Sequence, residues 1–198
     1  MNMPNNYANT STGDFTPIEL GGHHLVIRQV EETTSKTGRP MLKVLFDMAP
    51  NDKQAGYMLK EYDDDIRPDK KWPHNGTQYI LTEDENGYCS RSFKSFITSF
   101  EKSNKCEAIW GEKFASQFAK KRIGGVFGQV ENDYNGKTSM RHELRWFCED
   151  SKVDTAAVPA PKYLKGHNEV LGATSKPASD GLPDVDVSGG SEDCPFGK

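Results

Sequence analysis

One helix-like stripe set between strand-like segments most constrains how this chain can fold. Its apolar residues recur at the spacing of a single helix face: Phe93, Phe96, Ile97 and Phe100. Ser90 precedes the stripe and can cap the first turn. The spacing predicts a helix over residues 90–103 whose aromatic face belongs to a core. Much of the chain on either side alternates apolar and polar residues instead, which is typical of half-buried strands.

Strand patterns precede this helix. Residues 23–31 and 41–48 are predicted as two strands, and the polar run between them contains Gly38 and Pro40, so the pair forms a hairpin. Residues 57–62 are predicted to continue the sheet as a third strand. The short apolar stretch 78–81 fits either type of element.

Strand patterns also follow the helix, after a second helical stretch predicted near residues 107–120. Residues 122–131 and 138–148 are predicted as strands, joined by a two-residue turn at Asn135-Gly136. In the last strand the alternation places Trp146 on the same face as Leu144, which favours a core position for the indole.

This order of elements indicates a mainly β fold with helices. Three strands, a helix and two strands match an OB-fold-like five-stranded Greek-key barrel with the helix between strands 3 and 4. The predicted domain covers residues 20–150. A flexible N-terminal arm, residues 1–19, precedes it, and residues 151–198 form a linker and a disordered acidic tail.

The charge of the chain is concentrated at its end. Residues 166–198 carry two lysines and six acidic residues, a balance of −4 that equals the net charge of the whole chain. The remaining residues are neutral overall. An acidic extension on a neutral body is typical of a solubilising tail, or of a segment that recruits partners or competes for a basic groove.

Motifs for catalysis, cofactors and membranes are not found. There is no P-loop, no nucleophile elbow, no Cys-x-x-Cys pair and no metal-binding histidine spacing, so we expect a non-enzymatic protein without metal or cofactor. Asp63-Asp64-Asp65 could hold Mg²⁺, but such runs usually face water. No apolar run of 18 residues and no secretory signal is seen, and the four scattered cysteines fit reduced thiols of a cytosolic protein.

Single-stranded nucleic acid requires cations for phosphates and aromatic faces for bases. Several segments combine both, which gives these candidates: Lys43, Lys60, Tyr62, Lys70, Lys71, Trp72, Tyr134, Lys137, Arg141 and Arg145. Structural alternatives stand beside them. Trp72, before Pro73, can be a loop anchor, the two tyrosines can cover core, and Arg141 and Arg145 can be ordinary solvated charges.

The C-terminal residues Glu192, Asp193, Pro195 and Phe196 resemble the acidic-Pro-Phe tip of bacterial single-stranded DNA-binding proteins. Cys194 stands where that family has Ile, and Gly197-Lys198 follow the Phe. The resemblance implies a tail that binds replication and recombination proteins.

A second resemblance covers residues 22–147. The stretches 30–42, 70–73 (Lys-Lys-Trp-Pro) and 124–128 (Gly-Gly-Val-Phe-Gly) are similar to a family of phage and prophage proteins encoded among replication and recombination genes. The resemblance implies a viral single-stranded DNA-binding protein acting in the host cytoplasm. Barrels of this type often work as multimers, so a homo-oligomer is a possible state.

Two rival interpretations remain open. Because the body carries no net positive charge, the domain could be a protein-interaction module, such as a recombinase or helicase loader or an inhibitor of a host enzyme. A nuclease using Asp63-Asp64-Asp65 is the third hypothesis.

Overall fold

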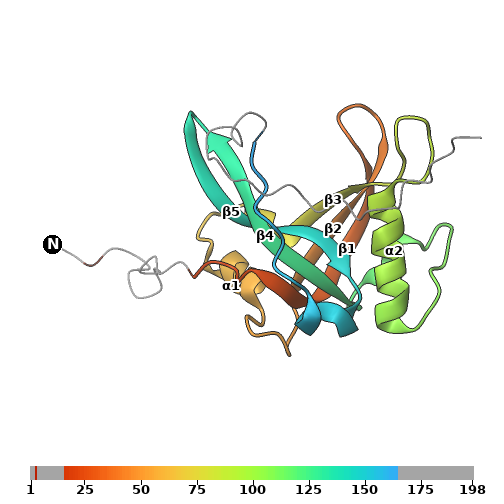
Figure 1. Ribbon diagram of the computed structural model, residues 1–198, viewed down its shortest axis with the longest axis horizontal. Helices are drawn as coiled ribbons and strands as arrows, with labels where there is room; N and C mark the ends of the chain where they lie inside the picture. Colours follow the sequence, from red (N-terminus) through yellow and green to blue (C-terminus); the bar gives the residue numbers. More distant parts are fainter. Residues whose placement is uncertain (1–2, 4–15, 165–198) are drawn as a thin grey trace, which may run out of the picture. The chain divides into compact units, whose positions relative to one another are not determined.

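The computed structural model describes Met3 and residues 16–164 (Figure 1). Its strands are β1 (Gly21–Thr34), β2 (Pro40–Met48), β3 (Thr77–Leu81), β4 (Arg122–Tyr134) and β5 (Lys137–Cys148). Two α-helices, α1 (Tyr57–Asp64) and α2 (Arg91–Asn104), are accompanied by 3₁₀ turns at His74–Gly76, Ala115–Phe118 and Asp150–Thr155. No helix within the described residues is both long and apolar enough to cross a bilayer.

The strands form one antiparallel sheet in the order β3-β2-β1-β4-β5. The prediction of five strands with a helix between the third and fourth is therefore confirmed. Closure into a barrel is not, because β3 and β5 form the two edges of the sheet and are not paired with each other. Strand β3 has only five residues, all paired with β2, which leaves little edge for a further ladder.

Residues 57–62, predicted as a strand, are instead helix α1. Gly56 adopts a left-handed conformation (φ 68°) that ends the preceding turns and starts the helix. The segment is rich in Leu, Met, Lys and Glu, which favour helices. Met58 is buried, and Tyr57 and Tyr62 are half-buried. The third strand, β3, instead contains residues 78–81, the short apolar stretch whose pattern fitted either a helix or a strand.

The second predicted helix, residues 107–120, is also wrong. Gly111 at φ 113° lies outside helical conformation, and the segment holds only the 3₁₀ turn Ala115–Phe118. The four-residue spacing of its aromatic residues still has a packing function, because Phe114 and Phe118 are buried. Trp110, however, is 65% exposed.

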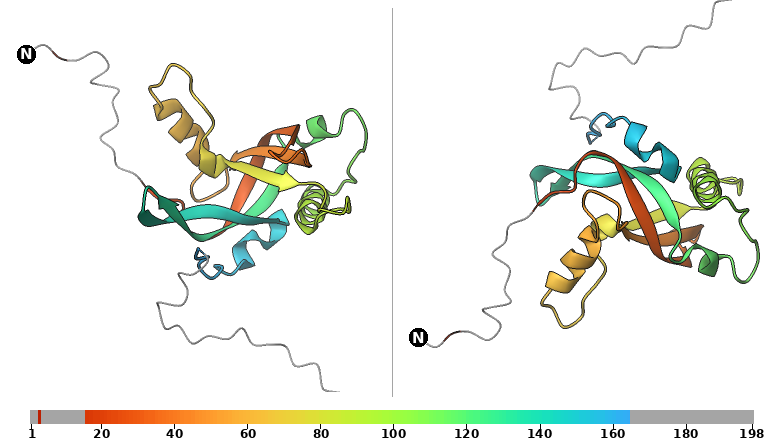
Figure 2. Two further views of the ribbon diagram at one scale, coloured as in Figure 1. Left: turned by 90° about the horizontal axis from the view of Figure 1, so that it is seen from above. Right: turned by 90° about the horizontal axis from the view of Figure 1, so that it is seen from below.

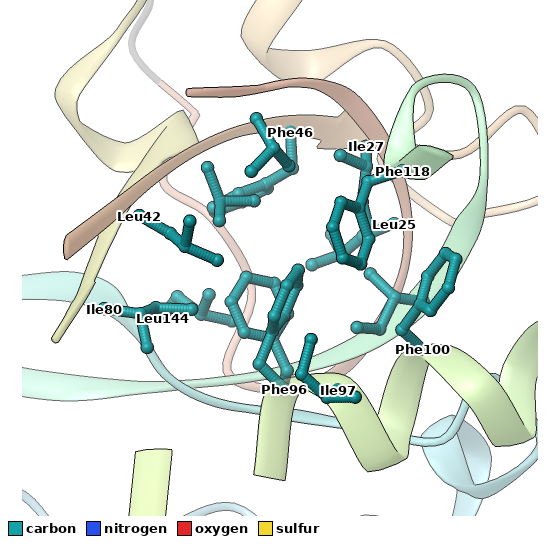
Figure 3. Close-up of a cluster of buried hydrophobic side chains, with 14 of the residues drawn as sticks. Leu25, Ile27, Leu42, Phe46, Ile80, Phe96, Ile97, Phe100, Phe118 and Leu144 are labelled. Carbon is teal, nitrogen blue, oxygen red and sulfur yellow. The ribbon is translucent and has the colours of Figure 1, made fainter. Parts of the chain in front are cut away.

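The core lies between α2 and the inner face of the sheet (Figure 3). Phe96, Ile97 and Phe100 of α2 point into it, as the helical stripe predicted. Ser90 caps the helix as expected, since its Oγ accepts a hydrogen bond from the Phe93 amide at 3.1 Å. Phe96 lies 5.1 Å, centroid to centroid, from Phe147 of β5, so helix and sheet share one aromatic cluster.

A bulge in β5 decides which of its side chains enter this core. Val126 pairs with Trp146 but Phe127 pairs with Leu144, so Arg145 is an extra residue in the ladder. The bulge shifts the alternation by one position. Phe147 is therefore buried, while Trp146, predicted as core, is 46% exposed.

The outer face of β1 and β4 is covered by the chain that follows β5. A Cβ on Gly22 would lie 2.0 Å from the Val153 carbonyl oxygen, so only glycine permits this approach. Farther along, Lys162 forms a parallel bridge with Val130, with hydrogen bonds to Gln129 and Glu131. Figure 1 shows this blue segment running beside β4.

Candidate nucleic-acid interface

Part of the predicted binding surface gathers where α1 approaches the β4–β5 hairpin (Figure 2). A cleft of about 430 Å³ lies there, lined by Pro17, Ile18, Glu61, His74, Asn75, Met140, Arg141 and His142. We call it the α1–β5 cleft. It brings the predicted residue Arg141 close to α1 and to the chain that follows Trp72.

Tyr62 and Trp72 form a ring pair in this region, with centroids 5.8 Å apart and planes at 36°. The Lys70 ammonium lies 5.6 Å from the Tyr62 centroid and also donates to the Asp63 carbonyl at 2.8 Å. Tyr62 therefore combines a half-buried ring with an adjacent cation. Lys60 and Lys71 nearby are exposed.

Trp72 acts as an anchor. Its Nε1 donates to the carbonyl oxygens of Phe46 at 3.2 Å and Gly76 at 3.0 Å, and the ring packs against the core. A Cβ on Gly76 would lie 2.5 Å from that nitrogen, so the glycine makes room for the indole. The loop-anchor alternative therefore describes Trp72 better than a free stacking platform does.

The β4–β5 hairpin presents a second aromatic residue with a cation. Tyr134 is 70% exposed and is the cross-strand partner of Lys137. The turn between them has positive φ at Asn135 (54°) and Gly136 (75°), the type I′ geometry that this dipeptide predicts. Both candidates are thus displayed on a regular hairpin.

Two predicted residues lie elsewhere and already have partners. Lys43, on the outer face of β2, pairs with Glu31 at 3.1 Å. Arg145, the bulge residue, donates to the carbonyl oxygens of Ala160 at 3.1 Å and Gln129 at 3.3 Å, and so holds the C-terminal segment on the sheet. Tyr79, which is half exposed and sits opposite Lys43, was not predicted, because its short strand showed no clear pattern.

Carboxylates limit the positive potential of the α1 region. Hydrogen bonds from the Arg67 side chain and backbone lower the pKa of Asp65 to about 2, so this carboxyl is ionised and already paired. Burial raises the pKa of Glu61, which lines the cleft. Within residues 16–164 no three metal-binding side chains come together, at Asp63-Asp64-Asp65 or elsewhere.

A more strongly basic surface, missed by the sequence analysis, lies along α2. This groove of about 740 Å³, the α2 groove, has one wall from the exposed face of α2 and another from the end of β5 and the 3₁₀ turn after it. Four cations line it: Arg91, Lys94, Lys102 and Lys152. Glu149 is its one acid. The stripe Arg91, Lys94, Thr98 and Lys102, opposite the phenylalanines, could have revealed one wall, but the other comes from residues 45 or more positions away.

An aromatic groove of opposite charge lies near the loop 107–114. The groove has a volume of about 940 Å³. Its apolar lining includes Met41, Leu42, Phe93, Trp110 and Phe114. Trp110 stacks on Phe114 with centroids 5.1 Å apart and planes at 15°. Its charged lining residues are Glu32, Glu83 and Glu112, with no Lys or Arg among them. We call this surface the Trp110 groove.

The predicted tail residues Glu192, Asp193, Pro195 and Phe196 lie outside the described residues. Neither protein-family models nor curated proteins match this chain. The geometry of the described residues is therefore the basis for the functional argument.

Proposed function

We propose that this chain is a phage-type, sequence-tolerant single-stranded DNA-binding protein that acts in DNA replication or recombination in the host cytoplasm. It binds DNA without catalysing a reaction on it. Its acidic C-terminal residues recruit replication or recombination proteins.

The observation that carries the proposal is the placement of tyrosine rings beside lysines at α1 with the loop after it, and on the β4–β5 hairpin. Tyr62 with Lys70, and Arg141 in the cleft itself, supply the two interactions that unpaired nucleotides need. Tyr134 with Lys137 repeats the combination on the hairpin. Stacking and phosphate contact do not depend on base edges, so binding through them is sequence-tolerant.

The sheet supports an OB-like assignment. An OB-fold is a partly open five-stranded barrel, and in this chain β1 pairs with both β2 and β4 while the helix follows the third strand. The edges β3 and β5 flank the cleft region through the turn His74–Gly76 and the residues Met140 to His142.

The test is a titration of the intact chain with fluorescently labelled oligo(dT) at two salt concentrations. We expect binding that weakens with salt, and a loss of about 1–3 kcal/mol for Tyr62→Ala or Tyr134→Ala. Tyr88→Ala is the matched control, because Tyr88 is as exposed as Tyr134 but lies in the loop before α2. Absence of binding at low salt contradicts the proposal.

One observation favours the rival class, a protein-interaction module. The Trp110 groove offers exposed aromatic surface rimmed by acids, which suits a basic, apolar protein segment and repels DNA. If this rival is right, Trp110→Ala abolishes capture of a host replication or recombination protein, and purified chain shows no oligonucleotide binding.

A further inference from the structure

We infer that the α2 groove is a second contact site for single-stranded nucleic acid, one that binds its sugar–phosphate backbone without reading or stacking its bases. The inference rests on the proposed function, because it concerns the same ligand. It adds a surface on another part of the molecule, formed by α2, the end of β5 and the turn Asp150–Thr155.

The cations of the groove are free to take an anion. Within the described residues, the side chains of Arg91, Lys94 and Lys102 make no hydrogen bond or ion pair. Lys152 makes only a loose pair with Glu149, at 3.7 Å. Unpaired cations on one wall are the arrangement that tracks phosphates.

The single acid of the groove does not cancel them. A hydrogen bond from Ser151 lowers the pKa of Glu149, and the charges of Lys152 and Lys102 lower it further, so the carboxylate is ionised, with Lys152 as its ion-pair partner. Four cations against one carboxylate leave an excess of three positive charges. Ser95 and Thr98 add hydroxyl groups that can donate to phosphate oxygens.

The walls are fixed to each other. Ser99 Oγ donates to the Phe147 carbonyl oxygen at 3.4 Å, and the Asp150 amide donates to Ser103 Oγ at 2.9 Å. Helix α2 is also anchored by its buried phenylalanines. The cations therefore project from a preformed surface, which lowers the entropy lost on binding.

The groove contains no exposed aromatic side chain: its one ring, Phe147, is buried. It thus lacks an aromatic stacking partner of the kind that Tyr62 provides on α1. The α2 groove is in this way assigned backbone contact alone, whereas Tyr62 is assigned base contact, which allows the two to be separated by experiment.

The decisive experiment compares oligo(dT) with an abasic oligonucleotide of the same length, using Arg91→Glu/Lys94→Glu in the intact chain. We expect the double variant to weaken binding of both ligands at least tenfold and to reduce the salt slope by about 1.4, or 0.7 per lost phosphate contact. Tyr62→Ala should weaken binding of oligo(dT) only.

The matched control is Lys113→Glu/Lys121→Glu, which makes the same charge change with exposed lysines that do not line the groove. All four substituted side chains are exposed, and circular dichroism checks that each variant is folded. Equal weakening by both double variants, or none by the groove variant while the unsubstituted chain binds, overturns the inference but leaves the proposed function standing. No binding by the unsubstituted chain contradicts the proposed function first.

A chemical probe gives a second, independent reading. Cys89 is exposed and lines the groove, whereas burial raises the pKa of Cys148 to about 11 and keeps it an unreactive thiol. In a chain carrying Cys106→Ser and Cys194→Ser, bound abasic oligonucleotide should slow alkylation of Cys89 by N-ethylmaleimide several-fold. An unchanged alkylation rate at saturating oligonucleotide contradicts the inference.

Discussion

At the scale of single residues, buried hydrogen-bonded side chains fix the start of β1. His23 is fully buried, and its Nδ1 lies 2.9 Å from Asp52 Oδ1 while its Nε2 lies 3.0 Å from the Glu19 carbonyl oxygen. Asp52 also accepts the amides of His24 at 2.7 Å and Gln54 at 2.9 Å. Local sequence patterns do not reveal this network, because Asp52 is 29 positions from His23 along the chain.

Asp52 makes the stability of the fold depend on pH. Burial alone would raise its pKa, but the hydrogen bonds from His23, Gln54 and His24 outweigh it, so the pKa is lowered. An acid with a lower pKa in the folded state stabilises the fold above its unfolded pKa of about 3.9, and this contribution is lost as pH falls through the folded value.

We therefore expect the free energy of unfolding, measured with urea between about pH 6 and pH 3, to fall more steeply with acid in the unsubstituted chain than in Asp52→Asn. Asp154→Asn, which removes an exposed carboxylate, is the control and should retain the steep fall. Parallel curves for Asp52→Asn and the unsubstituted chain contradict this prediction.

At the scale of helices and strands, some elements follow from the sequence pattern and others do not. The hairpin β1–β2, the turn at Asn135-Gly136 and the helix α2 follow from local spacing, and each was predicted. Helix α1 and the bulge at Arg145 were not. One extra residue in β5 reverses the alternation, and nothing in the local pattern shows that Arg145 is held by the carbonyl of Ala160.

The bulge predicts unequal losses of stability for substitutions at two neighbouring residues. Phe147→Ala removes a buried ring that packs on Phe46 and Phe96, so the free energy of unfolding should fall by about 3–5 kcal/mol. Trp146→Ala should lower it by only about 1 kcal/mol or less, since that ring is half exposed. Urea denaturation of both variants checks this, and a larger loss for Trp146→Ala would mean that the regular alternation holds after all.

At the scale of the whole molecule, the net charge does not show that basic and acidic residues gather on separate surfaces. Residues 16–164 carry 22 basic and 22 acidic residues, a balance of zero. The structure separates them: the α2 groove gathers four cations, and the Trp110 groove gathers three acids. The candidate interface could be predicted in part, because Tyr62, Lys70 and Arg141 stand out in the sequence. The α2 groove could not, since its walls meet only in the folded chain.

The acidic C-terminal segment should oppose this gathered positive charge. Removing residues 166–198 changes the net charge of the chain from −4 to zero. We expect the shortened chain to bind oligo(dT) more tightly at low salt, and the difference to shrink above roughly 0.15 M salt, where charges more than about 8 Å apart are screened. Titrations at several salt concentrations measure both effects.

A control of unchanged length, with the six acids of the segment replaced by Asn or Gln, separates the effect of charge from that of chain length. This control should bind oligo(dT) like the shortened chain. Weaker binding by the shortened chain would mean that the segment contributes to holding DNA rather than opposing it.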